Sequence, residues 1–62
     1  MKDSDPADRV RTLLLRGDNL LKNGRSSVKA REAFEEARQV AAEAELDERI
    51  QQLIERRLEQ LA

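Results

Sequence analysis

Two pairs of adjacent carboxylates are the residues best suited to acid–base chemistry: Glu35 with Glu36, and Asp47 with Glu48. Adjacent residues on a helix project in different directions, so neither pair can converge on one substrate atom. The chain contains no His, Cys or Tyr to act beside them as a base or nucleophile. We therefore expect that the protein is not an enzyme, and we assign it no catalytic, cofactor-binding or metal-binding residue.

Opposite charges also recur at the i, i+4 spacing that pairs side chains on a helix surface. The pairs are Arg31–Glu35, Asp18–Lys22 and Glu45–Arg49. Charged residues form 40% of the chain, and solvated helix faces account for most of them without any reaction chemistry.

The two halves of the chain carry opposite charge. Residues 1–31 hold eight basic and four acidic side chains, a net +4, whereas residues 32–62 hold four basic and nine acidic, a net −5. The basic half suggests a small nucleic-acid-binding regulatory protein as an alternative function. The net charge of the whole chain is nevertheless −1, and Phe34 is its single aromatic residue. We therefore rank nucleic acid below a protein as the partner. The basic residues considered are Arg9, Arg11, Arg16, Lys22, Arg25, Lys29 and Arg31.

The elements that must position these side chains are helices, because apolar residues recur at helical spacing in three segments and no segment alternates like a strand. The first segment covers residues 6–23. Asp5 is suited to cap its start, Pro6 to occupy its first position, and Gly24 to take a left-handed conformation after its end.

The second segment begins at Ser26 or Ser27 and continues to about residue 45. A third begins after Asp47, which can cap it, and runs to the end of the chain. Neither Gly nor Pro separates these two segments, so one long bent helix over residues 27–62 is the competing interpretation. We favour a break, because a chain this short must fold its apolar faces together.

The predicted fold is therefore all-α: an antiparallel helical hairpin over residues 5–45, with a short turn near residues 24–27, followed by a C-terminal helix over residues 46–62. Residues 1–4 are expected to form a flexible tail. The whole of residues 1–62 is expected to be one small domain.

Within the hairpin, two blocks of residues resemble the tetratricopeptide repeat (TPR), whose pattern is W-x2-L-G-x2-Y followed by A-x3-F. The resemblance implies a helical hairpin that stacks on neighbours, with residues 47–62 acting as a capping helix. Arg16 stands where the family prefers Leu, the segment between the blocks is one residue longer than usual, and no second repeat follows. The residues that match are Leu13, Gly17, Leu20, Ala30, Phe34 and Ala37, with Gly24 at the turn.

Several residues are candidates for contact with a partner. Leu15 points away from the apolar face of its helix and is either an ordinary exposed leucine or a residue that another helix covers. Arg57 lies within the apolar stripe of the third helix. It is either a boundary residue whose charged end reaches water, or one that pairs with a carboxylate across a helix interface. The candidates are Leu15, Leu53, Ile54, Arg57, Leu58 and Leu61.

These observations favour a protein–protein interaction or self-assembly module that buries an aliphatic helix face against a partner helix. About 60 residues give a marginal core, so we expect a homodimer or another homo-oligomer, with a two-fold dimer first. An engineered or excised repeat fragment without its own activity is a further alternative, although the capped start favours a self-contained protein. No stretch approaches the roughly 18 apolar residues of a membrane span, and we expect a cytoplasmic protein that does not bind membranes.

Overall fold

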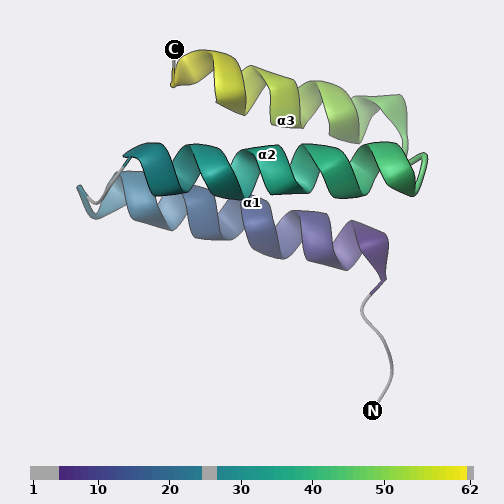
Figure 1. The fold of residues 1–62 in the computed structure, drawn as a ribbon, viewed down its shortest axis with the longest axis horizontal. Helices are drawn as coiled ribbons and strands as arrows, with labels where there is room; N and C mark the ends of the chain where they lie inside the picture. The colour runs from purple at the N-terminus through teal and green to yellow at the C-terminus, as the bar shows by residue number, and fades with distance from the viewer. Residues whose placement is uncertain (1–4, 25–26, 62) are drawn as a thin grey trace.

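The computed structural model describes residues 5–24 and 27–61. Three α-helices make up this part of the chain: α1 at Pro6–Lys22, α2 at Ser27–Glu43 and α3 at Glu48–Gln60. Successive helices run in opposite directions, and α2 lies between α1 and α3 (Figure 1). The all-α prediction with three short helices is confirmed, whereas the predicted tail at residues 1–4 and the possible cap at Ser26 fall outside the described residues.

Both ends of α1 lie close to where the sequence places them. Asp5 precedes the helix in an extended conformation and Pro6 occupies the first turn, although the Asp5 side chain makes no capping hydrogen bond. At the other end, Asn23 is the C-cap, and Gly24 follows with a φ of +68°. Its amide donates to the Leu21 carbonyl at 3.1 Å, so this glycine closes the helix in the left-handed conformation that disfavours other residues.

A break separates α2 from α3, which decides against one long helix. The chain leaves α2 through a left-handed residue, Glu45, at φ 53°. The Glu45 amide donates to the Ala42 carbonyl at 3.2 Å, and the Leu46 amide donates to the Ala41 carbonyl at 2.9 Å. This pair of hydrogen bonds forms a Schellman motif, which normally uses glycine at the left-handed position. The helix therefore ends at this point although neither Gly nor Pro follows it in the sequence.

Two polar side chains then fix the start of α3. The Asp47 carboxylate accepts a hydrogen bond from the Arg49 amide at 3.0 Å, as expected of an N-cap. The side-chain amide of Gln51 donates to the Leu46 carbonyl at 3.0 Å. These bonds hold the short connection against the first turn of α3 and set the direction in which the helix leaves α2.

The core lies where the three helices meet and is built mainly from small residues of α2 and larger ones of α1. The contact of α1 with α2 is the more extensive, and α3 packs chiefly on α2. Phe34 and Ile54 are the largest side chains that are fully buried. The buried cluster consists of Val10, Leu13, Leu14, Ala30, Phe34, Ala37, Ala41 and Ile54.

Gly17 allows α1 and α2 to approach closely. A methyl group built at Gly17 would lie 2.6 Å from Cζ and 2.9 Å from Cδ1 of Phe34, with Cε1 closer still. Real side chains essentially never come within such distances, so the aromatic ring occupies the space that any other residue would need. The ring is also fully buried, and its neighbours leave it little freedom to move away.

Replacement of Gly17 by Ala is therefore expected to destabilise the protein by about 1–3 kcal/mol through overpacking. This cost outweighs the ~0.5–1 kcal/mol that an alanine gains over glycine within a helix. Urea denaturation of the two proteins measures the difference. In a Phe34→Leu background the same substitution should cost less, because the ring is gone. A Gly17→Ala protein more stable than the wild type would show that the ring does not rest there.

A second prediction concerns Glu45. Because a non-glycine residue pays ~1–2 kcal/mol in the left-handed region, and glycine has an entropic cost of its own, Glu45→Gly should stabilise the protein by about 0.5–1 kcal/mol. Ala44→Gly is the matched control and should destabilise, since Ala44 has no positive φ. Thermal melts of both variants test this, and a loss of stability in Glu45→Gly would contradict the role of the Schellman motif.

Candidate interaction surfaces

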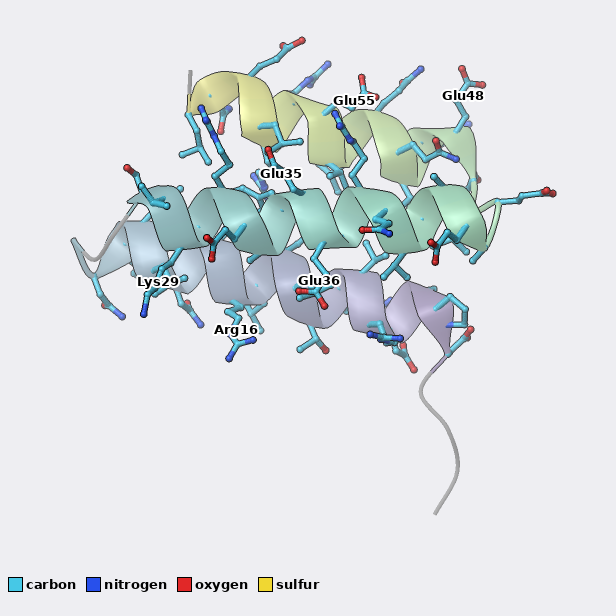
Figure 2. The ribbon with its side chains drawn as sticks, viewed as in Figure 1. Arg16, Lys29, Glu35, Glu36, Glu48 and Glu55 are labelled. Atoms are coloured by element: carbon cyan, nitrogen blue, oxygen red, sulfur yellow. The ribbon has the colours of Figure 1, made fainter. Side chains whose placement is uncertain are left out.

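The carboxylate pairs do not converge in the structure. Glu35 lies on the α3 side of α2, whereas Glu36 lies on the α1 side (Figure 2). Among the described residues, no group of three or more His, Cys, Asp or Glu side chains could hold a metal ion. In the same part of the chain, no helix has the length and apolar character needed to cross a membrane. The features that remain are an ion pair between helices, three surface hollows and the basic residues of α1.

One ion pair links α1 directly to α3. Arg57 Nη2 lies 3.1 Å from Asp18 Oδ2, and the two side chains are 34% and 39% exposed. The Nε atom of Arg57 is buried and has no hydrogen-bond partner. Arg57 is therefore a residue that pairs with a carboxylate across a helix interface, and the interface is internal to the chain. The i, i+4 pairing of Asp18 with Lys22 is replaced by this longer-range contact.

The apolar stripe of α3 is largely consumed by the fold itself. Ile54, which the sequence suggested as a partner-binding residue, is fully buried in the chain's own core, so it offers no surface to a partner. Leu58 and Leu61 are half-buried against the same cluster. Leu53 alone of these four stays substantially exposed, at 43%. The stripe is buried because it covers a face of α2.

Leu53 lies in a shallow hollow on the outer side of α3. The hollow measures about 180 Å³ and is lined by Leu53 with Arg49, Gln52 and Arg56. Two guanidinium groups therefore flank the one exposed apolar side chain. A partner would need carboxylates at this position to offset two positive charges.

A second hollow lies on the outer side of α1. It measures about 350 Å³, and Leu15 at its edge is 59% exposed. Among the described residues that line it, Arg16 is the one charged residue, in a chain where charged residues form 40% of the total. The other described lining residues are Thr12, Asn19, Leu20 and Asn23. An aliphatic side chain could enter this mostly uncharged hollow at a low desolvation cost.

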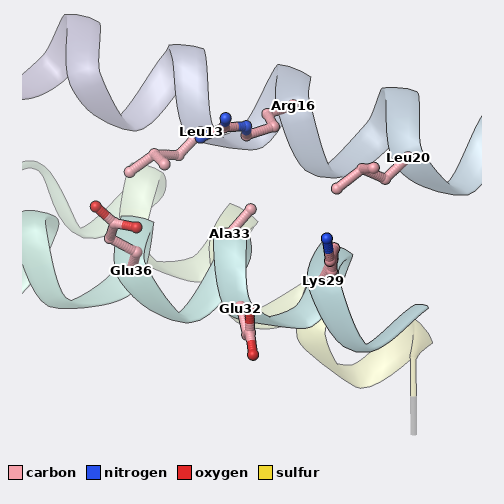
Figure 3. Close-up of a pocket in the computed structure, with 7 residues that line it drawn as sticks. All are labelled: Leu13, Arg16, Leu20, Lys29, Glu32, Ala33 and Glu36. Atoms are coloured by element: carbon pink, nitrogen blue, oxygen red, sulfur yellow. The ribbon is translucent and has the colours of Figure 1, made fainter. Parts of the chain in front are cut away.

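A third hollow, of about 370 Å³, follows the groove between α1 and α2. Leu13 and Leu20 point from α1 toward α2, and Ala33 points back toward α1 (Figure 3). Leu13 and Ala33 are already buried, so a ligand here would cover little further apolar area. The charged side chains in the lining are Arg16, Lys29, Glu32 and Glu36. The groove therefore favours polar contacts with mixed charge.

The basic residues of α1 do not form one continuous face. At about 100° per residue, Arg11 and Lys22 fall on one side of the helix, while Arg9 and Arg16 fall on the other. Asp18 lies near Arg11 and Lys22 on that wheel, and its carboxylate is already paired with Arg57. This division weakens the electrostatic argument for nucleic acid, which requires a continuous basic patch.

Sequence reasoning identified Leu15 and Leu53 as possible contact residues, and both are exposed in the structure. It did not single out Val28, which is 65% exposed near the start of α2. It also missed the hollow beside Leu15. The signal was present as a run of uncharged residues at helical spacing, Thr12, Asn19 and Asn23, in an otherwise highly charged chain.

In comparisons with protein-family models, with curated proteins and with solved structures, nothing matches this chain.

The ion pair generates a third prediction. A double-mutant cycle with Asp18→Asn and Arg57→Gln should give a coupling free energy of about 0.5–1 kcal/mol, the upper end of the range for partly exposed pairs. The same cycle with Asp18→Asn and Arg56→Gln is the control and should give none, because Arg56 is exposed beside Leu53. Equal coupling in both cycles would mean that Asp18 senses only the general charge of α3.

Proposed function

We propose that this chain is a protein–protein interaction module that assembles with copies of itself, burying exposed aliphatic side chains of its helices against a partner helix. The observation that carries the proposal is the position of Leu15. A single exposed leucine is ordinary in a folded protein, but this one borders a mostly uncharged hollow on the outer side of α1. Apolar area next to uncharged polar groups is typical of surfaces that become buried on association.

The size of the chain supports the same proposal. The chain has 62 residues and a mass of 7.1 kDa, and α3 packs chiefly on α2, so it covers little of α1. Since small domains bury a low fraction of their surface, additional burial through self-association would add stability.

The resemblance to a TPR hairpin gives further support. The Gly17–Phe34 contact joins two residues of the TPR-like pattern, and it does so as a close approach of one helix to the next. Repeats of this kind bury their outer faces against neighbouring repeats. In this chain the outer side of α1 is one such face that the other described helices leave uncovered. Another copy of the chain is the simplest partner to cover it.

Nucleic-acid binding remains a weaker alternative. The net charge is −1, and the arginines and lysine of α1 divide between two sides of the helix. Retention on heparin at physiological salt would be the result that favours it. We expect no retention.

The fourth prediction tests self-assembly directly. Sedimentation velocity from micromolar to millimolar protein should show the average mass rise from 7.1 kDa toward twice that value. The midpoint of thermal unfolding should rise with concentration over the same range, because association stabilises the folded state by mass action. A mass that stays at 7.1 kDa throughout, together with a constant melting temperature, would contradict the proposed function.

A further inference from the structure

A row of three residues runs along the outer side of α1. Asp8, Leu15 and Lys22 are seven residues apart, and seven residues turn a helix by about 20° less than two full turns. The three side chains therefore lie nearly in line along the helix, and all three residues are exposed. Leu15 is the centre of the row, with one negative and one positive residue at equal distances on either side.

We propose that a second copy of the chain docks on this row, so that the two α1 helices pack antiparallel about a two-fold axis near Leu15. The proposal rests on the self-assembly function proposed above and names its site and its geometry. The hollow beside Leu15 supplies the packing. Its lining includes residues at the i, i+3, i+4 and i+7 positions of α1, which is the four-residue hole that accepts a side chain from a facing helix. These residues are Thr12, Leu15, Arg16 and Asn19.

The two-fold axis makes this fit reciprocal. The two Leu15 side chains meet each other beside this hollow, because a two-fold interface uses the same patch twice and a residue near the axis faces its own copy. The uncharged side chains of Thr12 and Asn19 then lie beside the apolar contact, where they cost little to desolvate.

Charge selects the antiparallel direction. Because Asp8 and Lys22 are equidistant from Leu15, an antiparallel pair places Asp8 of each copy opposite Lys22 of the other, at both ends of the contact. A parallel pair would oppose Asp8 with Asp8 and Lys22 with Lys22, and like charges in register destabilise an interface. Closer to the centre, Arg11 lies at the level of the uncharged Asn19 in the antiparallel pair.

Leu53, the exposed leucine of α3, does not satisfy the same requirement. Arg49 and Arg56 line the hollow beside it, so a two-fold contact centred on Leu53 would bring four guanidinium groups together. Leu15 and Leu53 are both exposed, but their charged neighbours differ. We therefore assign self-association to the outer side of α1.

The size of the contact limits its strength. One pair of α-helices of 17 residues each buries less than the roughly 1,200 Å² at which stable interfaces begin. We therefore expect a weak, rapidly exchanging dimer.

The test uses charge reversal. Asp8→Lys alone should weaken dimerisation about tenfold, because attraction becomes repulsion at two symmetric positions. The double variant Asp8→Lys/Lys22→Asp should recover the wild-type dissociation constant, since its charges again oppose correctly. Mixed with the wild type, the double variant should form no heterodimer, because position 8 of each copy would then face a charge of the same sign at position 22 of the other. Circular dichroism confirms that each variant is helical.

A matched pair of apolar substitutions completes the test. Leu15→Gln should weaken dimerisation by at least about tenfold, and Leu53→Gln should leave it unchanged. If the wild type dimerises but the charge reversals and Leu15→Gln have no effect, this geometry is overturned while self-assembly stands. If Leu53→Gln weakens the dimer instead, the interface lies on α3. A wild type that stays monomeric overturns both proposals.

Discussion

The ring of Phe34 rests on the bare backbone of Gly17, and the arrangement of the other elements depends on this contact. With it, α1 and α2 lie close enough for the alanines of α2 to pack against the leucines and valine of α1. The remaining side of α2 then receives Ile54 from α3, which closes the core. A core made of one large ring, small residues and aliphatic side chains is sensitive to volume, since interiors are packed nearly as densely as crystals.

The same packing determines which surfaces remain. Because the apolar stripes of α1 and α3 both turn toward α2, each of these helices directs its opposite side outward. The Asp18–Arg57 ion pair joins α1 to α3, so these two helices contact each other as well as α2. On α1 the outer side carries Leu15 in a mostly uncharged setting, and on α3 it carries Leu53 between arginines. Charge, more than apolar area, distinguishes the surface that we propose to pair with a copy of itself.

Much of this fold follows from local sequence signals, and the rest depends on contacts that sequence spacing does not reveal. Helical periodicity, together with Pro6 and Gly24, predicted the bounds of α1, and Asp47 predicted the start of α3. The end of α2 was uncertain because Glu45 occupies a position where glycine is usual. The pairing of Asp18 with Arg57 and the burial of Ile54 both arise from packing between helices distant in sequence. The hollow beside Leu15 likewise exists only once Leu20 and its neighbours are positioned.

If two copies meet through antiparallel α1 helices, paramagnetic broadening between the copies reveals this geometry most directly. The chain contains no cysteine, so Asp5→Cys provides one spin-label site, at an exposed residue whose side chain makes no capping bond. The labelled copy is mixed with a nitrogen-15 copy that carries no label. In the antiparallel dimer, the amide signals near Lys22 and Asn23 of the second copy should broaden. Broadening near Ala7 and Asp8 instead, or along α3, would contradict it.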